Sequence, residues 1–189
     1  MSDVTPHLHL SMAELQAGLE HIRRAPKDNG AVEMIVRRPK KLAREVLQEA
    51  QLDLADGLVG DNWKSRGSRM RRDGSADPEQ QITIMNSRVI ALVAGHRERW
   101  PLAGDQLLID LDLSADNLPA GTQLAIGSAA VQITAAPHTG CGQFNWRFGH
   151  DALMFVNSAI GKQLCLRGVN AKVVQPGLVR VGDRARKLP

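Results

Sequence analysis

Residues 120–144, AGTQLAIGSAAVQITAAPHTGCGQF, decide the fold class of this chain. Apolar residues alternate with small or polar ones on both sides of Gly127 and Ser128, which is the pattern of two antiparallel strands joined by a tight turn. A polar, glycine-rich segment that contains Cys141 follows directly. The stretch therefore predicts a β-hairpin that leads into an accessible cysteine.

Other short apolar runs along the chain predict further strands. They are bounded by glycine, proline and polar residues, and they lie at 31–38, 81–86, 107–113 and, on either side of Pro176–Gly177, within 170–183. Many short strands with turn signals between them favour a barrel or a sandwich over a parallel sheet flanked by helices. We therefore predict a mainly β fold of the α+β class with peripheral helices.

Four segments predict these helices. Ser11 and Glu14 have the spacing of a capping box and open an apolar stripe, so we expect a helix over residues 12–24. Pro39 is a good first helical residue, and the apolar residues between 42 and 50 predict a short helix after it. Residues 88–95 and 149–160 predict two more. We expect residues 1–30 to form a helical extension before a β domain over residues 31–189.

Composition limits the class of protein. Aromatic residues make up 3% of the chain while 43% is hydrophobic, so the core must be aliphatic. The first thirty residues lack the apolar run of a signal peptide, and no window has the roughly 20 apolar residues of a membrane span. Only two cysteines are present, which is typical of a reducing compartment. We expect a cytoplasmic protein without a membrane partner.

The charge of +4 is unevenly distributed. Residues 64–72, KSRGSRMRR, carry five basic residues and no acid. Such a loop can attract an anionic ligand, or it can simply be a solvated surface loop. It contains no aromatic residue to stack on bases, so nucleic-acid binding is the weakest interpretation.

The order of several motifs resembles the MOSC domain, the C-terminal domain of molybdenum cofactor sulfurases. The resemblance runs from about residue 31 to the end of the chain. It consists of GLVGD at 57–61, QITIMN at 81–86, the hairpin of 120–137, Cys141, Arg167–Gly168, and NAKVVQPGLVRVGD at 170–183.

This resemblance implies a closed β-barrel and a role in binding the molybdenum cofactor (molybdopterin) or in handling sulfur for it. In relatives the cysteine is a molybdenum ligand or a proposed sulfur carrier, which makes Cys141 the candidate here. Some relatives are fused to a pyridoxal-phosphate-dependent desulfurase domain, which this chain lacks. A sulfur-donating protein or a molybdoenzyme is the implied protein partner.

Cys141 is the candidate catalytic residue and metal ligand, since a thiolate is both a nucleophile and a soft ligand. Gly140 and Gly142 leave room for a ligand to approach it. His138 can accept the thiol proton or supply positive charge. The alternative is that Cys141 is a buried apolar filler, the role we expect for Cys165 between two leucines.

The candidate cofactor-binding residues are Arg167, Asn145, Arg66 and Arg69. The cofactor carries a phosphate, which Arg167 can bind with two parallel hydrogen bonds, unless it is a structural arginine paired with an acid. Asn145 can hydrogen-bond a ligand carbonyl or ring edge. Arg66 and Arg69 belong to the basic loop.

Two functions from different classes remain open. The first is a thiol-dependent enzyme or sulfur-transfer protein that acts with the molybdenum cofactor through Cys141. The second is a non-catalytic binding module for an anionic small molecule. The two differ in whether the sulfur of Cys141 is essential, so enzyme activity is left undecided by the sequence.

Overall fold

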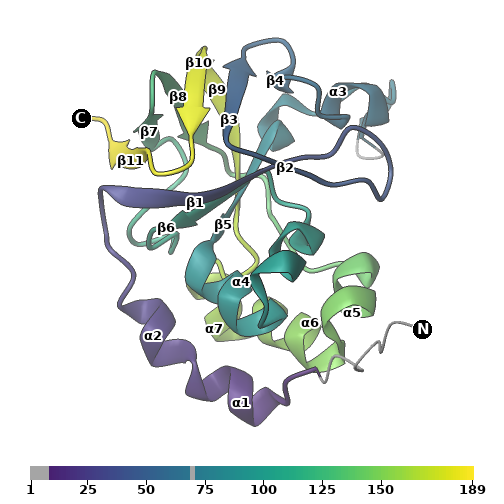
Figure 1. The fold of residues 1–189 in the computed structure, drawn as a ribbon, viewed down its shortest axis with the longest axis vertical. Helices are drawn as coiled ribbons and strands as arrows, with labels where there is room; N and C mark the ends of the chain where they lie inside the picture. The colour runs from purple at the N-terminus through teal and green to yellow at the C-terminus, as the bar shows by residue number, and fades with distance from the viewer. Residues whose placement is uncertain (1–8, 69–70) are drawn as a thin grey trace.

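The computed structural model describes residues 9–68 and 71–189. Seven strands form a closed barrel in the order β11-β7-β8-β9-β5-β6-β1, and β11 pairs back onto β1 (Figure 1). Only β5 and β6 are parallel among these pairs. The barrel strands are β1 (Gly30–Arg37), β5 (Ile82–Asn86), β6 (Leu107–Asp110), β7 (Gln123–Ile126), β8 (Ala129–Ile133), β9 (Val169–Gln175) and β11 (Arg184–Lys187).

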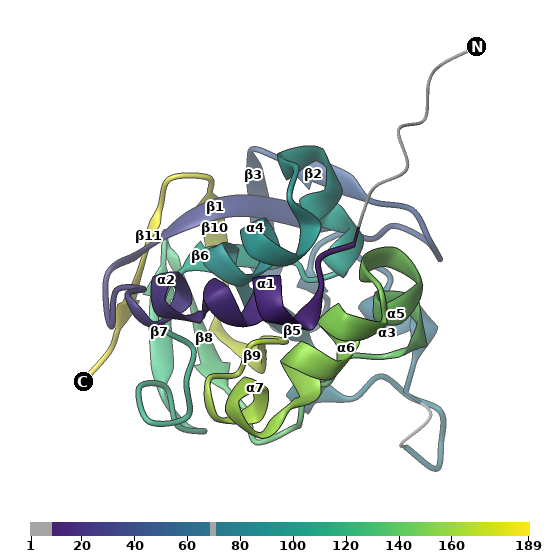
Figure 2. The ribbon, with the colours of Figure 1, turned by 90° about the horizontal axis from the view of Figure 1, so that it is seen from below.

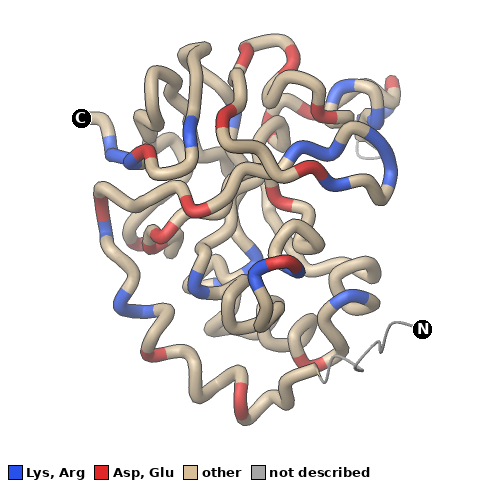
Figure 3. The backbone as a smooth tube through the Cα atoms, viewed as in Figure 1, with Lys and Arg blue, Asp and Glu red and all other residues tan. Residues whose placement is uncertain are grey.

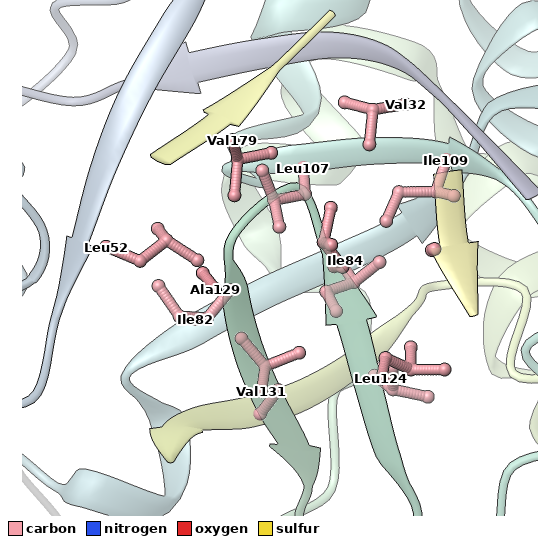
Figure 4. Packing of buried hydrophobic residues seen from close by; sticks show 14 of the residues in the cluster. Val32, Leu52, Ile82, Ile84, Leu107, Ile109, Leu124, Ala129, Val131 and Val179 are labelled. Carbon is pink, nitrogen blue, oxygen red and sulfur yellow. The ribbon is translucent and has the colours of Figure 1, made fainter. Parts of the chain in front are cut away.

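The barrel interior follows the period of two expected of strands. Ile82 and Ile84 of β5 point inward together with Leu107 and Ile109 of β6, and all four are completely buried (Figure 4). Met85, the residue after Ile84, faces outward to the helices. The described interior cluster holds only aliphatic side chains, as the composition predicts. The predicted fold class, a mainly β barrel with peripheral helices, is confirmed.

A small second sheet packs against the barrel. It contains β3 (Glu49–Asp53), β4 (Gly57–Leu58) and β10 (Gly177–Arg180), and its Leu52, Leu58 and Val179 belong to the same buried cluster as the barrel interior. The strand pair expected within 170–183 is present as β9 and β10, but the two lie in different sheets because β9 pairs with β8 and β5.

The helix predicted after Pro39 is wrong. The segment forms β2 (Glu45–Leu47), which pairs with β1, and then β3. Leu42 and Val46, which an apolar helical stripe would bury, are 59% and 53% exposed. Ala50 and Leu52 are buried on either side of exposed Gln51, which is strand alternation, and pairing with neighbouring strands overrides the local helical spacing.

Helices cover one side of the barrel (Figures 1 and 2). Their buried side chains pack on outward-facing strand residues such as Met85 and Leu108. No described helix combines the length and apolar character needed to cross a membrane. The helices are α1 (Met12–Ala17), α2 (Leu19–Arg23), α3 (Trp63–Arg66), α4 (Ser87–Ala94), α5 (Gly142–Phe148), α6 (His150–Asn157) and α7 (Ala159–Gln163), with 3₁₀ turns η1 (Pro78–Gln80) and η2 (Arg97–Ala103).

Two predicted helices are divided. The expected helix over 12–24 has its capping box, with the Ser11 amide donating to Glu14 Oε2 at 2.8 Å, but it divides at Gly18 into α1 and α2. The expected helix over 149–160 ends at Asn157, because Ser158 is extended and caps α7. The α5 helix directly after Cys141 was not predicted.

Candidate functional site

A cavity of about 320 Å³ lies on the outer face of the barrel beside Cys141. Thr83 of β5 and Asn170 of β9 are cross-strand partners and form part of its wall. Thr83 lies between Ile82 and Ile84, which point into the barrel, so its side chain points outward to the cavity. The rest of the wall comes from η1, the end of η2, the segment before α5, α5 itself, and residues of α3 and of the chain after β1 and before β9.

The segment before α5 is held in place at both ends. The Asn170 side-chain amide donates to the carbonyl oxygens of Ala136 and Pro137, at 3.1 and 3.2 Å. The Asn157 side chain accepts from the Gly140 amide at 2.8 Å and donates to its carbonyl at 3.2 Å. A Cβ at Gly140 would lie 2.8 Å from Leu153 Cδ1 and 3.0 Å from Val156 Cγ2, so a larger residue would require side chains of α6 to shift.

Cys141 is consequently presented to solvent. It has an extended backbone at the start of α5, it is exposed, and it lines the cavity. Cys165 is only partly exposed, and burial raises the pKa of its thiol. The structure therefore excludes the buried-filler alternative for Cys141 and leaves Cys165 as the less reactive thiol.

Arg167 is paired with an acid. Its Nη1 lies 2.6 Å from Asp105 Oδ2, its Nη2 donates to the Ala103 carbonyl, and its guanidinium lies 5.0 Å from the centroid of the Phe144 ring. Asp105 is completely buried as a side chain, and this burial raises the pKa of its carboxyl against the opposing charge of Arg167. Two of the three guanidinium nitrogens are thus already bonded within the protein. This arrangement is the alternative considered above, in which Arg167 is a structural arginine paired with an acid.

His138 is neutral in this environment. Burial lowers the pKa of its imidazole well below 6.5, and the charges of Arg167 and Arg38 act in the same direction. Its Nε2 lies 3.6 Å from Asp105 Oδ1, and its buried Nδ1 has no hydrogen-bond partner among the described residues. A neutral imidazole can accept a proton, but it supplies no positive charge to the thiol.

The Gly-Asp turn of GLVGD positions a second buried arginine. The Asp61 carboxylate accepts two hydrogen bonds from the Arg38 guanidinium, both 2.8 Å long, and one from the Arg38 amide at 2.9 Å. The Asp61 side chain is 0% exposed and that of Arg38 7%. Arg38 also donates to the Gly104 carbonyl, so the chain after β1 is tied to the end of η2.

Three further arginines face the cavity without a carboxylate partner among the described residues. Arg44 donates to the carbonyls of Ala43 and Pro101, and Arg147 to that of Leu102. Burial lowers the pKa of Arg44 to about 10, and the charges of Arg147 and Arg38 contribute. The pKa of Arg66 is lowered as well, because the surrounding protein partly shields its guanidinium from water. These cations repel one another, so a bound anion would stabilise the cluster.

The structure brings four of the predicted residues to this one cavity, namely Cys141, His138, Arg167 and Arg66. Asn145 lies on α5 but is not among the described residues that line it. Arg69 lies outside the described residues. The functional roles of all six stay predictions.

Sequence reasoning missed Arg38, Arg44, Asp105 and Arg147 as residues of the site. A signal for Arg147 was present, because the spacing of Phe144, Arg147 and Phe148 places them on one buried helix face. Asp61 was part of the quoted GLVGD motif without a role. No local pattern marked Asp105, since its partner Arg167 is far away in the chain.

The side chains do not form a metal site of their own. Within residues 9–68 and 71–189, no group of three or more His, Cys, Asp or Glu has a suitable arrangement for a metal ion. A metal ligated by Cys141 would therefore have to arrive with most of its other ligands, as it does in an organic cofactor.

Comparison with known proteins identifies the family. A model of the MOSC domain matches residues 71–186, and the chain belongs to the MOSC domain family. This family is associated with the molybdenum cofactor. No curated protein matches the chain.

Solved structures share the fold. The YuaD protein of Bacillus subtilis is 19% identical, with a TM-score of 0.63 over 83% of this chain and 94% of its own. YiiM of Escherichia coli is also 19% identical, with a TM-score of 0.53 over 84% of this chain and 70% of its own. YiiM of Geobacillus stearothermophilus is 13% identical, with a TM-score of 0.52 over 86% of this chain and 73% of its own. These identities support the same fold and no more.

Replacing Asp61 with Asn should destabilise the protein strongly. Asn keeps the shape but leaves Arg38 as a buried charge without its counter-ion, so we expect the free energy of unfolding to fall by about 3–5 kcal/mol. Asp56→Asn is the matched control, because Asp56 pairs with Lys64 at the surface and is 51% exposed. It should cost less than about 1 kcal/mol. Urea unfolding measures both, and equal losses would contradict the assignment.

His138 should make stability depend on pH. Its pKa is lowered in the folded protein, so below about pH 6.5 the unfolded chain binds a proton that the folded protein does not, and stability falls. The loss is at most about 1.4 kcal/mol per pH unit. The pKa of Asp105 is raised, so its contribution changes stability with pH in the opposite direction. Asp105 is still present when His138 is replaced, so its contribution is common to the variant and the wild type.

His138→Gln should therefore flatten the decrease in stability between about pH 7 and pH 5, as measured by urea unfolding. The control is His21→Gln on the exposed face of α2, which should keep the wild-type slope. If both variants show the same slope as the wild type, His138 does not stay neutral on folding.

Proposed function

We propose that this protein binds the molybdenum cofactor, or handles sulfur for it, at the cavity beside Cys141. One observation carries the proposal: an exposed thiol shares a cavity with five arginines and only two buried acids that pair with them. The arginines are Arg38, Arg44, Arg66, Arg147 and Arg167. A thiolate is a soft metal ligand, and the arginines supply surplus positive charge. Together they suit a bound molecule that carries both a metal or sulfur centre and a phosphate.

The residues present fit such a group. Arg44, Arg66 and Arg147 would hold the phosphate, since Arg38 and Arg167 are already paired with acids. Cys141 would supply the thiolate, and Arg147 lies close enough for its charge to interact with that thiolate. The bound cofactor would supply a redox-active metal centre.

In the sulfur-carrier version, the Cys141 thiolate attacks the outer sulfur of a persulfide on a sulfur-donating protein. The sulfur–sulfur bond of the donor breaks, Cys141 becomes a persulfide, and the donor leaves as a thiolate, so no external oxidant or reductant is required. The exposure of Cys141 makes its sulfur accessible to such a partner.

A non-catalytic binding module for an anionic small molecule is the second candidate. The setting of His138 favours it, because Nδ1 is buried and Nε2 faces Asp105. The histidine nearest to Cys141 in the sequence is therefore buried beside an acid. In this case the arginine cluster alone would account for binding.

Replacing Cys141 with Ser tests the role of the sulfur. In protein purified from cells that make the cofactor, we expect molybdenum by metal analysis and pterin by fluorescence, and Cys141→Ser should lose at least about tenfold of the metal. Cys165→Ser is the matched control and should retain both signals. If Cys141→Ser keeps its metal and any sulfur-transfer activity, the binding module is the better account.

Brief alkylation of the folded protein provides a test that needs no cofactor. Mass-spectrometric mapping should find Cys141 labelled well before Cys165, because Cys141 is exposed while burial raises the pKa of Cys165. Faster labelling of Cys165 would contradict the assignment of Cys141 as the accessible thiol.

A further inference from the structure

A second and larger cavity of about 870 Å³ adjoins the first. The two share five lining residues, so the outer cavity lies directly beside the inner one. The shared residues are Arg38, Arg44, Arg66, Gln80 and Gln143. Cavities of this size class accommodate whole organic ligands rather than single ions.

The walls of this outer cavity are strongly basic. Seven of its described lining residues are Lys or Arg, and none of the described ones is acidic; the seven are Arg38, Lys40, Lys41, Arg44, Arg66, Arg71 and Arg72. Figure 3 shows two of the basic groups, one on the loop that follows β1 and one around α3. These groups lie on different segments, and the fold brings both to the lining of one cavity.

Little of this charge is neutralised within the protein. Arg38 pairs with Asp61, and Arg71 lies 3.5 Å from Asp73. Lys40, Lys41 and Arg66 have no ion pair among the described residues. A concave surface with uncompensated charge of one sign concentrates counter-ions, and the repulsion among these cations is relieved only when an anion binds.

The wall also restricts the kind of anion. No described lining residue of the outer cavity is a carboxylate, so the wall offers no charged oxygen ligand to a magnesium ion bridging phosphates. None is aromatic either, which disfavours the base-stacking surfaces of single-stranded nucleic acid sites. Arginine guanidinium groups can bind phosphate oxygens with paired hydrogen bonds, and separate lysine ammonium groups can pair with the same oxygens, so no metal ion is required between them.

We propose that the outer cavity is a second anion subsite, which takes a phosphate or diphosphate group of an organic ligand without a bridging metal ion. The proposal rests on the function proposed for the inner cavity, because it describes what lies beyond the anion held there. The group is either the far end of the ligand that reaches Cys141 or a separate phosphorylated molecule that meets it. Both sources present the same phosphate chemistry to the outer cavity. They differ in whether a ligand bound in the inner cavity also blocks the outer one.

Calorimetric titration in the presence of EDTA tests the subsite. The probes are ADP, pyrophosphate and inorganic phosphate. ADP and pyrophosphate should bind at least about tenfold more tightly than phosphate, since they can contact cations on more than one wall. Lys40→Ala/Lys41→Ala should weaken ADP and pyrophosphate about tenfold and leave phosphate within about twofold. Both lysines are exposed, so the variant should fold normally.

The matched control is Arg23→Ala/Arg24→Ala, which removes two adjacent exposed cations from α2. It should bind all three probes as the wild type does. Equal affinity for ADP and phosphate, or the same effect of both double variants, would overturn the subsite. Tighter binding of a single-stranded oligonucleotide than of ADP, lost in Lys40→Ala/Lys41→Ala, would overturn the small-molecule assignment in favour of nucleic acid.

Protein loaded with cofactor distinguishes the two sources. If it still binds ADP, the subsite takes a separate molecule; if ADP no longer binds, the far end of the same ligand occupies it. Failure of the inner site can be recognised separately, because Cys141→Ser should change the metal content and not the affinity for ADP. Loss of ADP binding in Lys40→Ala/Lys41→Ala with metal content unchanged supports the outer subsite alone.

Discussion

Pairing of β1 with β11 closes the barrel, and the arrangement of the site depends on this closure. Gly30 and Ala31 pair with Ala185 and Arg184, so the beginning of the described barrel meets its end. Closure leaves no open edge between these strands and gives the interior one continuous aliphatic cluster. A Cβ at Gly30 would lie 2.4 Å from the Asp110 carbonyl oxygen, so only glycine permits this close junction with β6.

The site consists of chain segments that leave or enter the strands of this barrel. Arg38 directly follows β1, Asp105 precedes β6, His138 follows β8, and Arg167 precedes β9. Two of these side chains are fixed by a partner from another segment, Arg38 by Asp61 at 2.8 Å and Arg167 by Asp105 at 2.6 Å. A closed barrel holds these strand ends at constant separation, which keeps the cavity in shape without a bound ligand.

The charges of the site perform two different tasks. Arg38–Asp61 and Arg167–Asp105 are buried pairs, and they tie the walls together at a considerable cost in desolvation. Arg44, Arg66 and Arg147 lack such partners among the described residues, so their charge is available to a ligand. Arg167 of the predicted set is held by Asp105, whereas the arginines without a partner are Arg66, which the basic loop indicated, and Arg44 and Arg147, which no sequence motif indicated.

The sequence by itself determined the mainly β class and the hairpin before the cysteine, and it favoured an exposed Cys141, because alternation, turn residues and glycines act locally. Closure into a barrel was implied by the resemblance to the MOSC domain, because the strand pattern alone also suits a sandwich. It indicated a helix after Pro39 where the structure has β2 and β3, since the local spacing of apolar residues suits a helix while strand partners decide otherwise. Asn145 shows the same limit, because its nearness to Cys141 in sequence does not bring it to the cavity. Only the tertiary structure paired Asp105 with Arg167 and gathered the uncompensated arginines, because a buried charge is defined by partners that lie far apart along the chain.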